Sequence, residues 1–167
     1  MDESSRRTSV VPHGFMARLW AIVLSANMVG AIIFALLLKL VVIFEPDLGA
    51  VLGKIGTKGY AAGFWPTFVS GLFAGWLIAL MVWLLPGADT AKVTIIIIIT
   101  YVIGLGGFAH IIAGSIAVFY VLFDGEATFG LFLMRFFLPA LTGNILGGVA
   151  FVTAINHAQV NPEGNSK

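Results

Sequence analysis

The sequence predicts an all-helical membrane protein with four transmembrane spans. Of its 167 residues, 59% are hydrophobic and only 10% are charged, whereas a soluble domain carries about 25% charged residues. A chain of this length cannot bury so much apolar surface in one aqueous core, because small domains leave a large share of their surface exposed. Four apolar segments each reach the length that a helix needs to cross a bilayer, about 20 residues.

The membrane domain is predicted to cover residues 19–157, between a polar N-terminal segment (1–18) and a polar C-terminal tail (158–167). The segment that joins the first two spans contains Lys54 and Lys58 and is predicted to be a loop. The four predicted spans are residues 19–44, 63–85, 93–123 and 129–155.

The third span is too long for one straight helix. As a single helix it would extend about 46 Å at ~1.5 Å per residue, against a hydrocarbon core of about 30 Å. Gly104, Gly106 and Gly107 lie in its middle, where glycine destabilises a helix. We therefore expect a break near Gly106-Gly107. Because lipid cannot satisfy exposed backbone groups, such a break must be buried in protein or line a water-filled path. The five consecutive isoleucines 95–99 do not argue for a strand, because each span must satisfy its own backbone hydrogen bonds.

With four spans, both termini and the loop between the second and third spans lie on the same side of the membrane. Lysine and arginine are slightly more frequent on that side. Basic residues favour the cytoplasmic side of a membrane. We therefore expect a multi-pass protein of the inner (plasma) membrane with both termini in the cytoplasm. The basic residues on this side are Arg6, Arg7, Arg18, Lys92 and Lys167.

A ten-residue pattern occurs twice. Residues 25–34 and 142–151 share the order hydroxyl, small, Asn, two apolar residues, Gly, small, two non-polar residues, Phe. An Asn in the middle of a span is costly unless it faces protein or water. Chance recurrence in glycine-rich helices is the alternative explanation. If the repeat is genuine, the first and fourth spans are equivalent positions of two three-helix units with opposite orientation, as in many transporters. Two spans of the first unit are then expected to be missing before residue 19.

His110 is the histidine that lies inside a predicted span. It shares a helical face with Gly106 and Gly114, at a spacing of four residues. An ionisable residue at this depth is a functional candidate, with helix packing as the alternative. It could provide positive charge or a proton to a passing weak-acid anion.

The two asparagines of the repeat, Asn27 and Asn144, could line a pore or form hydrogen bonds between helices, and the residues alone do not separate these roles. Gly30 follows the first of them, and Gly147 and Gly148 follow the second. Glycines at such spacing allow close helix packing in membranes.

Other classes of function have no support in the sequence. The chain contains no cysteine, which excludes disulfides and thiolate metal sites. No catalytic triad, metal-ligand cluster or nucleotide-binding motif is present, so we predict no enzyme activity, no catalytic residues, no metal and no cofactor. The net charge of +1 gives no indication of nucleic-acid binding.

Four segments in order resemble the formate/nitrite transporter family over roughly residues 15–157. The segments are 26–31 (ANMVGA), 75–83 (GWLIALMVW), 107–110 (GFAH) and 143–148 (GNILGG). They are similar to the third to sixth helices of that family. The resemblance implies an aquaporin-like, six-helix inverted-repeat fold, a homopentamer with one pore per protomer, and passage of small monovalent anions such as formate or nitrite, with protons in many members.

The resemblance also assigns residues to the pathway and shows departures. His110 matches the family's central pore histidine, Phe108 lies in the same motif, and Lys58 is the nearest candidate for a family lysine. The family's Glu before the histidine is Ala109 here, its Ser-x-Ala-Asn after it is 111–114 (IIAG), and its Cys-Asn pair is 74–75 (AG). These changes indicate a divergent subgroup. The alternatives to an anion channel are an aquaporin-like pore for neutral solutes and a truncated fragment that does not transport.

Overall fold

The computed structural model describes residues 13–42 and 46–160; in this part of the chain all regular secondary structure is helical, without a strand. The elements in order are α1 (His13–Val42), α2 (Pro46–Ala61), α3 (Phe64–Leu84), η1 (Leu85–Gly87), η2 (Asp89–Ala91), α4 (Lys92–Gly106), α5 (Ile111–Phe123), α6 (Phe129–Leu131), η3 (Phe132–Phe137) and α7 (Leu138–Val160).

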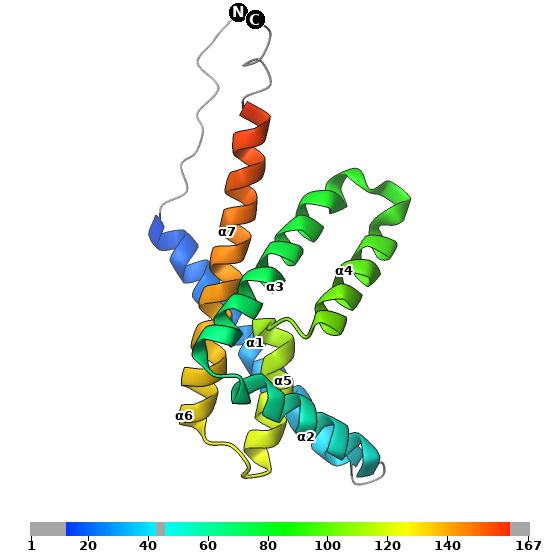
Figure 1. The fold of residues 1–167 in the computed structure, drawn as a ribbon, viewed down its shortest axis with the longest axis vertical. Coiled ribbons are helices and arrows are strands. Elements are labelled where there is room, and N and C mark those ends of the chain that lie inside the picture. Colours follow the sequence, from blue (N-terminus) through cyan, green and yellow to red (C-terminus); the bar gives the residue numbers. More distant parts are fainter. Residues whose placement is uncertain (1–12, 43–45, 161–167) are drawn as a thin grey trace, which may run out of the picture.

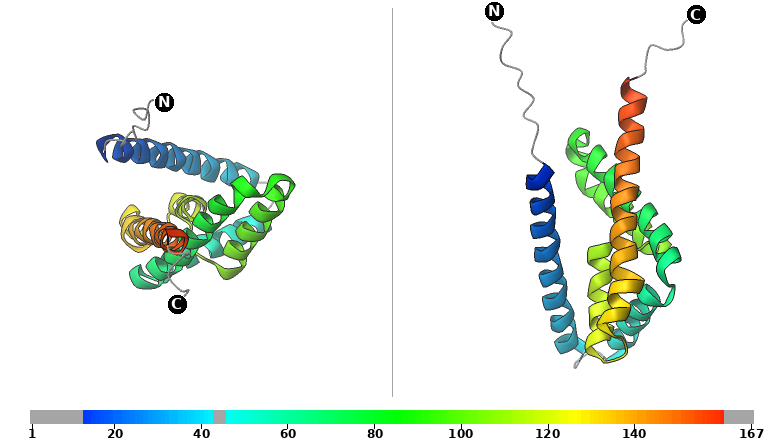
Figure 2. Two further views of the ribbon diagram at one scale, coloured as in Figure 1. Left: turned by 90° about the horizontal axis from the view of Figure 1, so that it is seen from above. Right: turned by 90° about the vertical axis from the view of Figure 1, so that its left-hand side faces the viewer.

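Four helical segments are long and apolar enough to cross a membrane: Gly14–Val41, Phe64–Gly87, Asp89–Gly106 and Phe129–Ala158. Many of their large apolar side chains point outward; Leu105 is 76% exposed and Trp65 70%. Such surfaces are costly in water and are compatible with lipid. The start of α1 and the end of α7 lie at the same end of the molecule (Figure 1 and Figure 2).

The segment between the first two predicted spans is a helix, so the prediction of a loop was wrong. Helix α2 begins with Pro46, which favours a first helical position because its missing N–H has no partner there anyway. Asp47 follows in the first turn, where a negative charge is favourable. The helix packs against α5, and Gly56 lies against the carbonyl oxygen of Ala117. The sequence pattern hid this helix because its apolar stretch is interrupted by two lysines.

The third apolar stretch is not one helix: α4 ends at Gly106 and α5 begins at Ile111, which confirms the break expected near Gly106-Gly107. The fourth begins irregularly: α6 passes into the π-helical turn η3 before α7. Pro139, in the first turn of α7, has no N–H to donate to the carbonyl of Arg135. A wider π-turn is a common way for a helix to absorb such a defect.

The most extensive helix contact joins α3 and α7. Glycines lie on both sides of it: Gly75 meets the backbone of Asn144, and Gly147 meets the carbonyl of Leu72. No side chain separates the two backbones there, which is the packing expected of small residues in membrane helices.

The apolar core lies between α1, α5, η3 and α7. It includes Ala35, Val118, Phe119, Phe132 and Phe136. At the end of the molecule where α1 finishes, Lys39 forms an ion pair with Asp124 and lies 4.9 Å from the ring centroid of Tyr120. These contacts connect α1 to the far end of α5.

Candidate functional site: a cavity at the break between α4 and α5

Helix α4 ends in a local motif that the glycines make possible. Gly107 has φ 60°, in the left-handed region, and its N–H donates to the carbonyl of Gly104 at 3.1 Å. The N–H of Phe108 donates to the carbonyl of Ile103 at 3.0 Å. This pair of bonds is the Schellman arrangement, in which a left-handed glycine ends a helix and satisfies its last carbonyls. The break therefore follows directly from the local sequence.

His110 begins α5 as its N-cap residue. Its backbone is extended (φ −94°, ψ 122°), and its Nδ1 accepts a hydrogen bond from the N–H of Ala113 at 3.5 Å. Because Nδ1 is the acceptor, the proton of the neutral imidazole is assigned to Nε2. The histidine thus presents an N–H donor while it caps a helix start, where the backbone already favours negative charge.

Asn144 on α7 holds the break in place. Its Oδ1 accepts from the N–H of Ile111 at 2.9 Å. Its Nδ2 donates to the carbonyls of Ala109 at 2.8 Å and Gly71 at 2.9 Å. Both amide hydrogens and one oxygen lone pair are therefore used by backbone groups of three other segments. Of the two roles open for this side chain, the structure shows the interhelical hydrogen bonds.

Ser70 on α3 supports the break from another side. Its Oγ accepts from the N–H of Ala109 at 2.9 Å and contacts the carbonyl of Gly107 at 3.5 Å. Together, Ser70 and Asn144 form hydrogen bonds with backbone groups that have no helical partner at the break. The hydrocarbon core of a bilayer cannot form such hydrogen bonds. Ser70 is not among the residues predicted from the sequence. A signal was present, because Thr67, Ser70 and Gly71 are small or polar residues on one face of an apolar helix.

A cavity of about 640 Å³ lies at this break, lined by residues of α2, α3, α4, α5 and η3 together with residues 107–110. It brings together three of the predicted pathway residues, Lys58, Phe108 and His110. Most of the remaining wall is apolar. The polar side chains that line it are Lys58, Thr67, Ser70, Thr100 and His110.

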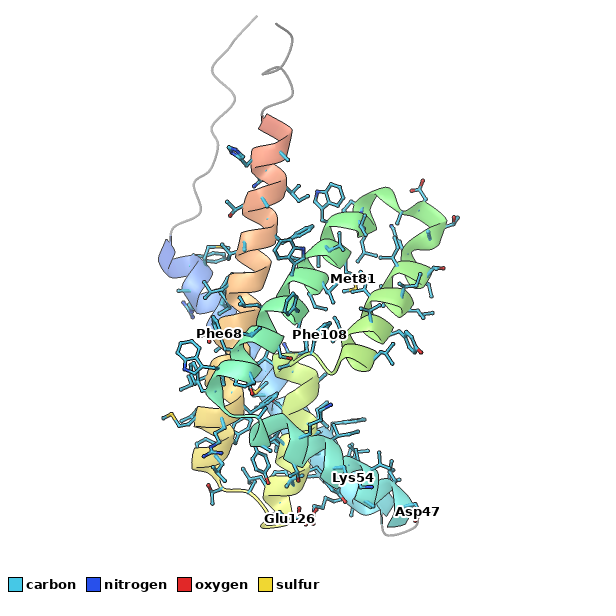
Figure 3. All side chains as sticks on the ribbon, in the orientation of Figure 1. Asp47, Lys54, Phe68, Met81, Phe108 and Glu126 are labelled. Atoms are coloured by element: carbon cyan, nitrogen blue, oxygen red, sulfur yellow. The ribbon has the colours of Figure 1, made fainter. Side chains whose placement is uncertain are left out.

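Lys58 reaches the break from the last turn of α2. Its Nζ would lie 3.3 Å from a Cβ placed on Gly107. Phe108, half-buried, stacks on Phe73 of α3 with 5.6 Å between ring centroids; Figure 3 shows it where α4 gives way to α5. An ammonium group and an imidazole thus share one largely apolar cavity.

The predicted glycines fall into different surroundings. Gly106 and Gly107 end α4, and Gly114 lies against the ring of Phe136. Gly147 is in the α3–α7 contact, whereas a Cβ placed on Gly148 would lie 3.7 Å from the nearest atom, an ordinary van der Waals contact.

The structure does not bring Asn27 and Gly30 to the cavity. Asn27 is exposed on α1, and its Nδ2 donates to the carbonyl of Val23 in the same helix at 2.8 Å. A Cβ on Gly30 would meet nothing within 4 Å. The two copies of the repeated pattern therefore have unlike environments in this chain.

Comparison with known proteins matches the chain to a transporter family and to two longer relatives. A family model described as "Formate/nitrite transporter" matches residues 5–158. The inner membrane protein YfdC of Escherichia coli is 36% identical over 154 residues, which cover 92% of this chain and 50% of that protein. The uncharacterized transporter YrhG of Bacillus subtilis is 29% identical over 145 residues, 81% of this chain and 52% of that protein. The chain thus spans about half the length of these curated relatives. No solved structure gives a significant match.

Proposed function

Because the chain belongs to the formate/nitrite transporter family, we propose that it forms part of the pathway of a membrane channel for small monovalent anions such as formate or nitrite. The observation that carries this proposal is the shared cavity of Lys58 and His110. Basic groups in a largely apolar wall favour anions over cations.

The chemistry of the two basic residues suits a weak-acid anion. Lys58 supplies a compact positive charge near the cavity wall. His110 supplies an N–H donor through Nε2, because Nδ1 is occupied by Ala113. A second proton would go to Nδ1 and displace the hydrogen bond from Ala113; the imidazolium then adds a charge and can give its Nε2 proton to a bound carboxylate or nitrite. The cavity also has room for several waters, each of which occupies about 30 Å³.

Anion flux into proteoliposomes tests the proposal. We expect Lys58→Ala and His110→Ala each to lower formate and nitrite flux by about fivefold or more, because each removes a group that favours the anion. Lys54→Ala is the matched control: it removes the same charge one turn earlier on α2, at a residue that does not line this cavity. Equal flux through all four proteins would remove both residues from the mechanism.

The same assay separates the competing functions. An aquaporin-like pore for neutral solutes would conduct glycerol independently of pH and of the charge at residues 58 and 110. A fragment that does not transport would give no flux of either solute.

We also propose that the complete pore is a six-helix inverted repeat in which two helices outside this chain complete the wall, assembled as a homopentamer. In the matching motif, the amide of Asn144 holds the break between α4 and α5. The amide of Asn27 is exposed and the space at Gly30 is open, which supports a further helix beside them in the complete pore. The observation that the relatives are about twice as long agrees with it. Crosslinking of the purified assembly measures the subunit number.

For its location we propose the inner membrane, with both termini in the cytoplasm. The relative from Escherichia coli is named as an inner membrane protein, and the basic residues favour that orientation. Reporter fusions at each terminus test the orientation.

A further inference from the structure

Ser70 holds the two peptide groups that flank Phe108. Its Oγ accepts from the N–H of Ala109 at 2.9 Å and contacts the carbonyl of Gly107 at 3.5 Å. The N–H of Phe108 itself donates to the carbonyl of Ile103 at 3.0 Å. A residue has only two soft backbone dihedrals, and both are fixed when the planar peptide groups on its two sides are held. The direction in which the Phe108 side chain leaves the backbone is therefore set from α3.

The hydroxyl of Ser70 makes a tertiary contact where other helical hydroxyls make a local one. A hydroxyl within a helix can donate to the carbonyl four residues earlier, and those of Thr100, Ser115 and Thr142 do so at 2.7, 2.6 and 2.8 Å. Ser70 bonds instead to residues 37 and 39 positions further along the chain. Removal of this hydroxyl therefore affects the break rather than α3.

The Phe108 ring lies between the cavity and the outer surface of the protein. Phe108 lines the cavity and stacks on Phe73, whereas Phe73 is 55% exposed and is not among the residues that line the cavity. On the α4 side the ring covers Gly106, since a Cβ placed there would lie 2.7 Å from it. The surface beyond Phe73 is apolar, with Val69 47% and Trp76 46% exposed on the same helix, and such a surface suits lipid.

We propose that Ser70 is a positioning residue that holds the Phe108 ring against Phe73 and thereby closes the cavity toward lipid between α3 and α4. Without the hydroxyl, the two peptide groups lose their support, so the ring can turn away from Phe73 and leave a lateral opening. Any pathway for a charged solute needs this closure, because hydrocarbon excludes charge. The closure is independent of which solute the cavity admits and so extends beyond the proposed anion pathway.

Asn144 supports the next cavity residue in the same way. It binds the carbonyl of Ala109 and the N–H of Ile111, which belong to the peptide groups on either side of His110. The part of the break that carries His110 therefore keeps its support when the hydroxyl of Ser70 is removed. We expect Ser70→Ala to fold and to disturb the wall at Phe108.

The test measures how readily oxygen, which partitions into the bilayer, reaches the cavity. The chain has no cysteine, so a nitroxide attached to Ala113→Cys reports from the cavity wall. Its collision rates with oxygen and with a water-soluble nickel chelate are measured in liposomes. We expect Ser70→Ala to raise the oxygen rate about fivefold, as for the loss of one neutral hydrogen bond, and to leave the nickel rate unchanged. Ser115→Ala is the matched control, because that hydroxyl is bonded to the carbonyl of Ile111 within α5 and does not line the cavity; it should equal the parent protein.

A double-mutant cycle shows whether Ser70 acts through the ring. Phe108→Ala removes the ring and should raise the oxygen rate at least as much as Ser70→Ala, and the double variant should equal Phe108→Ala. Phe73→Ala removes the stacking partner at an exposed position outside the break and should also raise the rate. This variant keeps the wall testable if Ser70→Ala fails to fold.

Four results would overturn the inference. A parent oxygen rate in Ser70→Ala, or in Phe73→Ala, would show that the ring is not the closure. An equal rise in Ser115→Ala would mark a general loosening of the helices. Additive effects of Ser70→Ala and Phe108→Ala would mean that Ser70 acts elsewhere. A rise for nickel in place of oxygen would show water rather than lipid beyond Phe73. None of these readouts depends on anion flux, so a chain that does not transport anions would reject the proposed function and leave the closure standing.

Discussion

Replacing Asn144 with alanine should destabilise the protein far more than the same change at Asn27. Asn144 makes three hydrogen bonds, at 2.8–2.9 Å, to the backbone of Ile111, Ala109 and Gly71. A net hydrogen bond contributes about 1 kcal/mol, and interhelical bonds in membrane bundles average about 0.6 kcal/mol. Three such bonds predict a loss of about 2–3 kcal/mol for Asn144→Ala, because the backbone groups at the break lose their partners within the bilayer.

Asn27→Ala is the matched control, since the two asparagines occupy the same place in the repeated pattern. Its single bond goes to Val23 in its own helix and its side chain is exposed. We expect a change within about 0.5 kcal/mol, as for most surface substitutions.

The free energy of unfolding of the purified chain is measured in mixed micelles by titration with a denaturing detergent. Equal losses for the two variants, or a loss below about 1 kcal/mol for Asn144→Ala, would refute the clamping role of Asn144. A protease added to the folded protein gives a second readout, because a loosened break should be cut sooner than the wild-type one.

Further predictions concern the glycines and the cavity. Gly147→Ala should cost about 1–3 kcal/mol, because its Cβ would collide with the backbone of α3, whereas Gly148→Ala should stay near wild type since its Cβ has only ordinary contacts; unfolding titrations compare them. Gly107→Ala should cost about 1–2 kcal/mol, because φ 60° disfavours a side chain, and a wild-type stability would exclude the left-handed helix end. The chain has no cysteine, so single cysteines can be labelled without background. Ala113→Cys in the cavity should react with a water-soluble thiol reagent in liposomes, and Val152→Cys on the outer surface should not; absence of reaction at Ala113→Cys would show that water does not reach the cavity.

The amino-acid sequence by itself determined the features that depend on composition and on near neighbours in the chain. Apolar runs of sufficient length give membrane-spanning helices in any context, because lipid leaves the backbone few alternatives. The end of α4 is equally local: glycines at 104, 106 and 107 permit the left-handed turn whatever packs around it. The family resemblance also came from short segments, and the family comparison confirms it.

Only the tertiary structure decided what the polar side chains do. The same Asn pattern occurs twice, yet Asn144 binds three segments and Asn27 only its own helix. The inclusion of Lys58 and Thr67 in one cavity with His110 depends on how α2 and α3 lie against the break. The partners of Asn144 come from residues distant in sequence, and in a bilayer a buried polar group without a partner is costly. The local sequence determines where helices form, whereas the packing of the helices determines which partners the side chain of Asn144 finds.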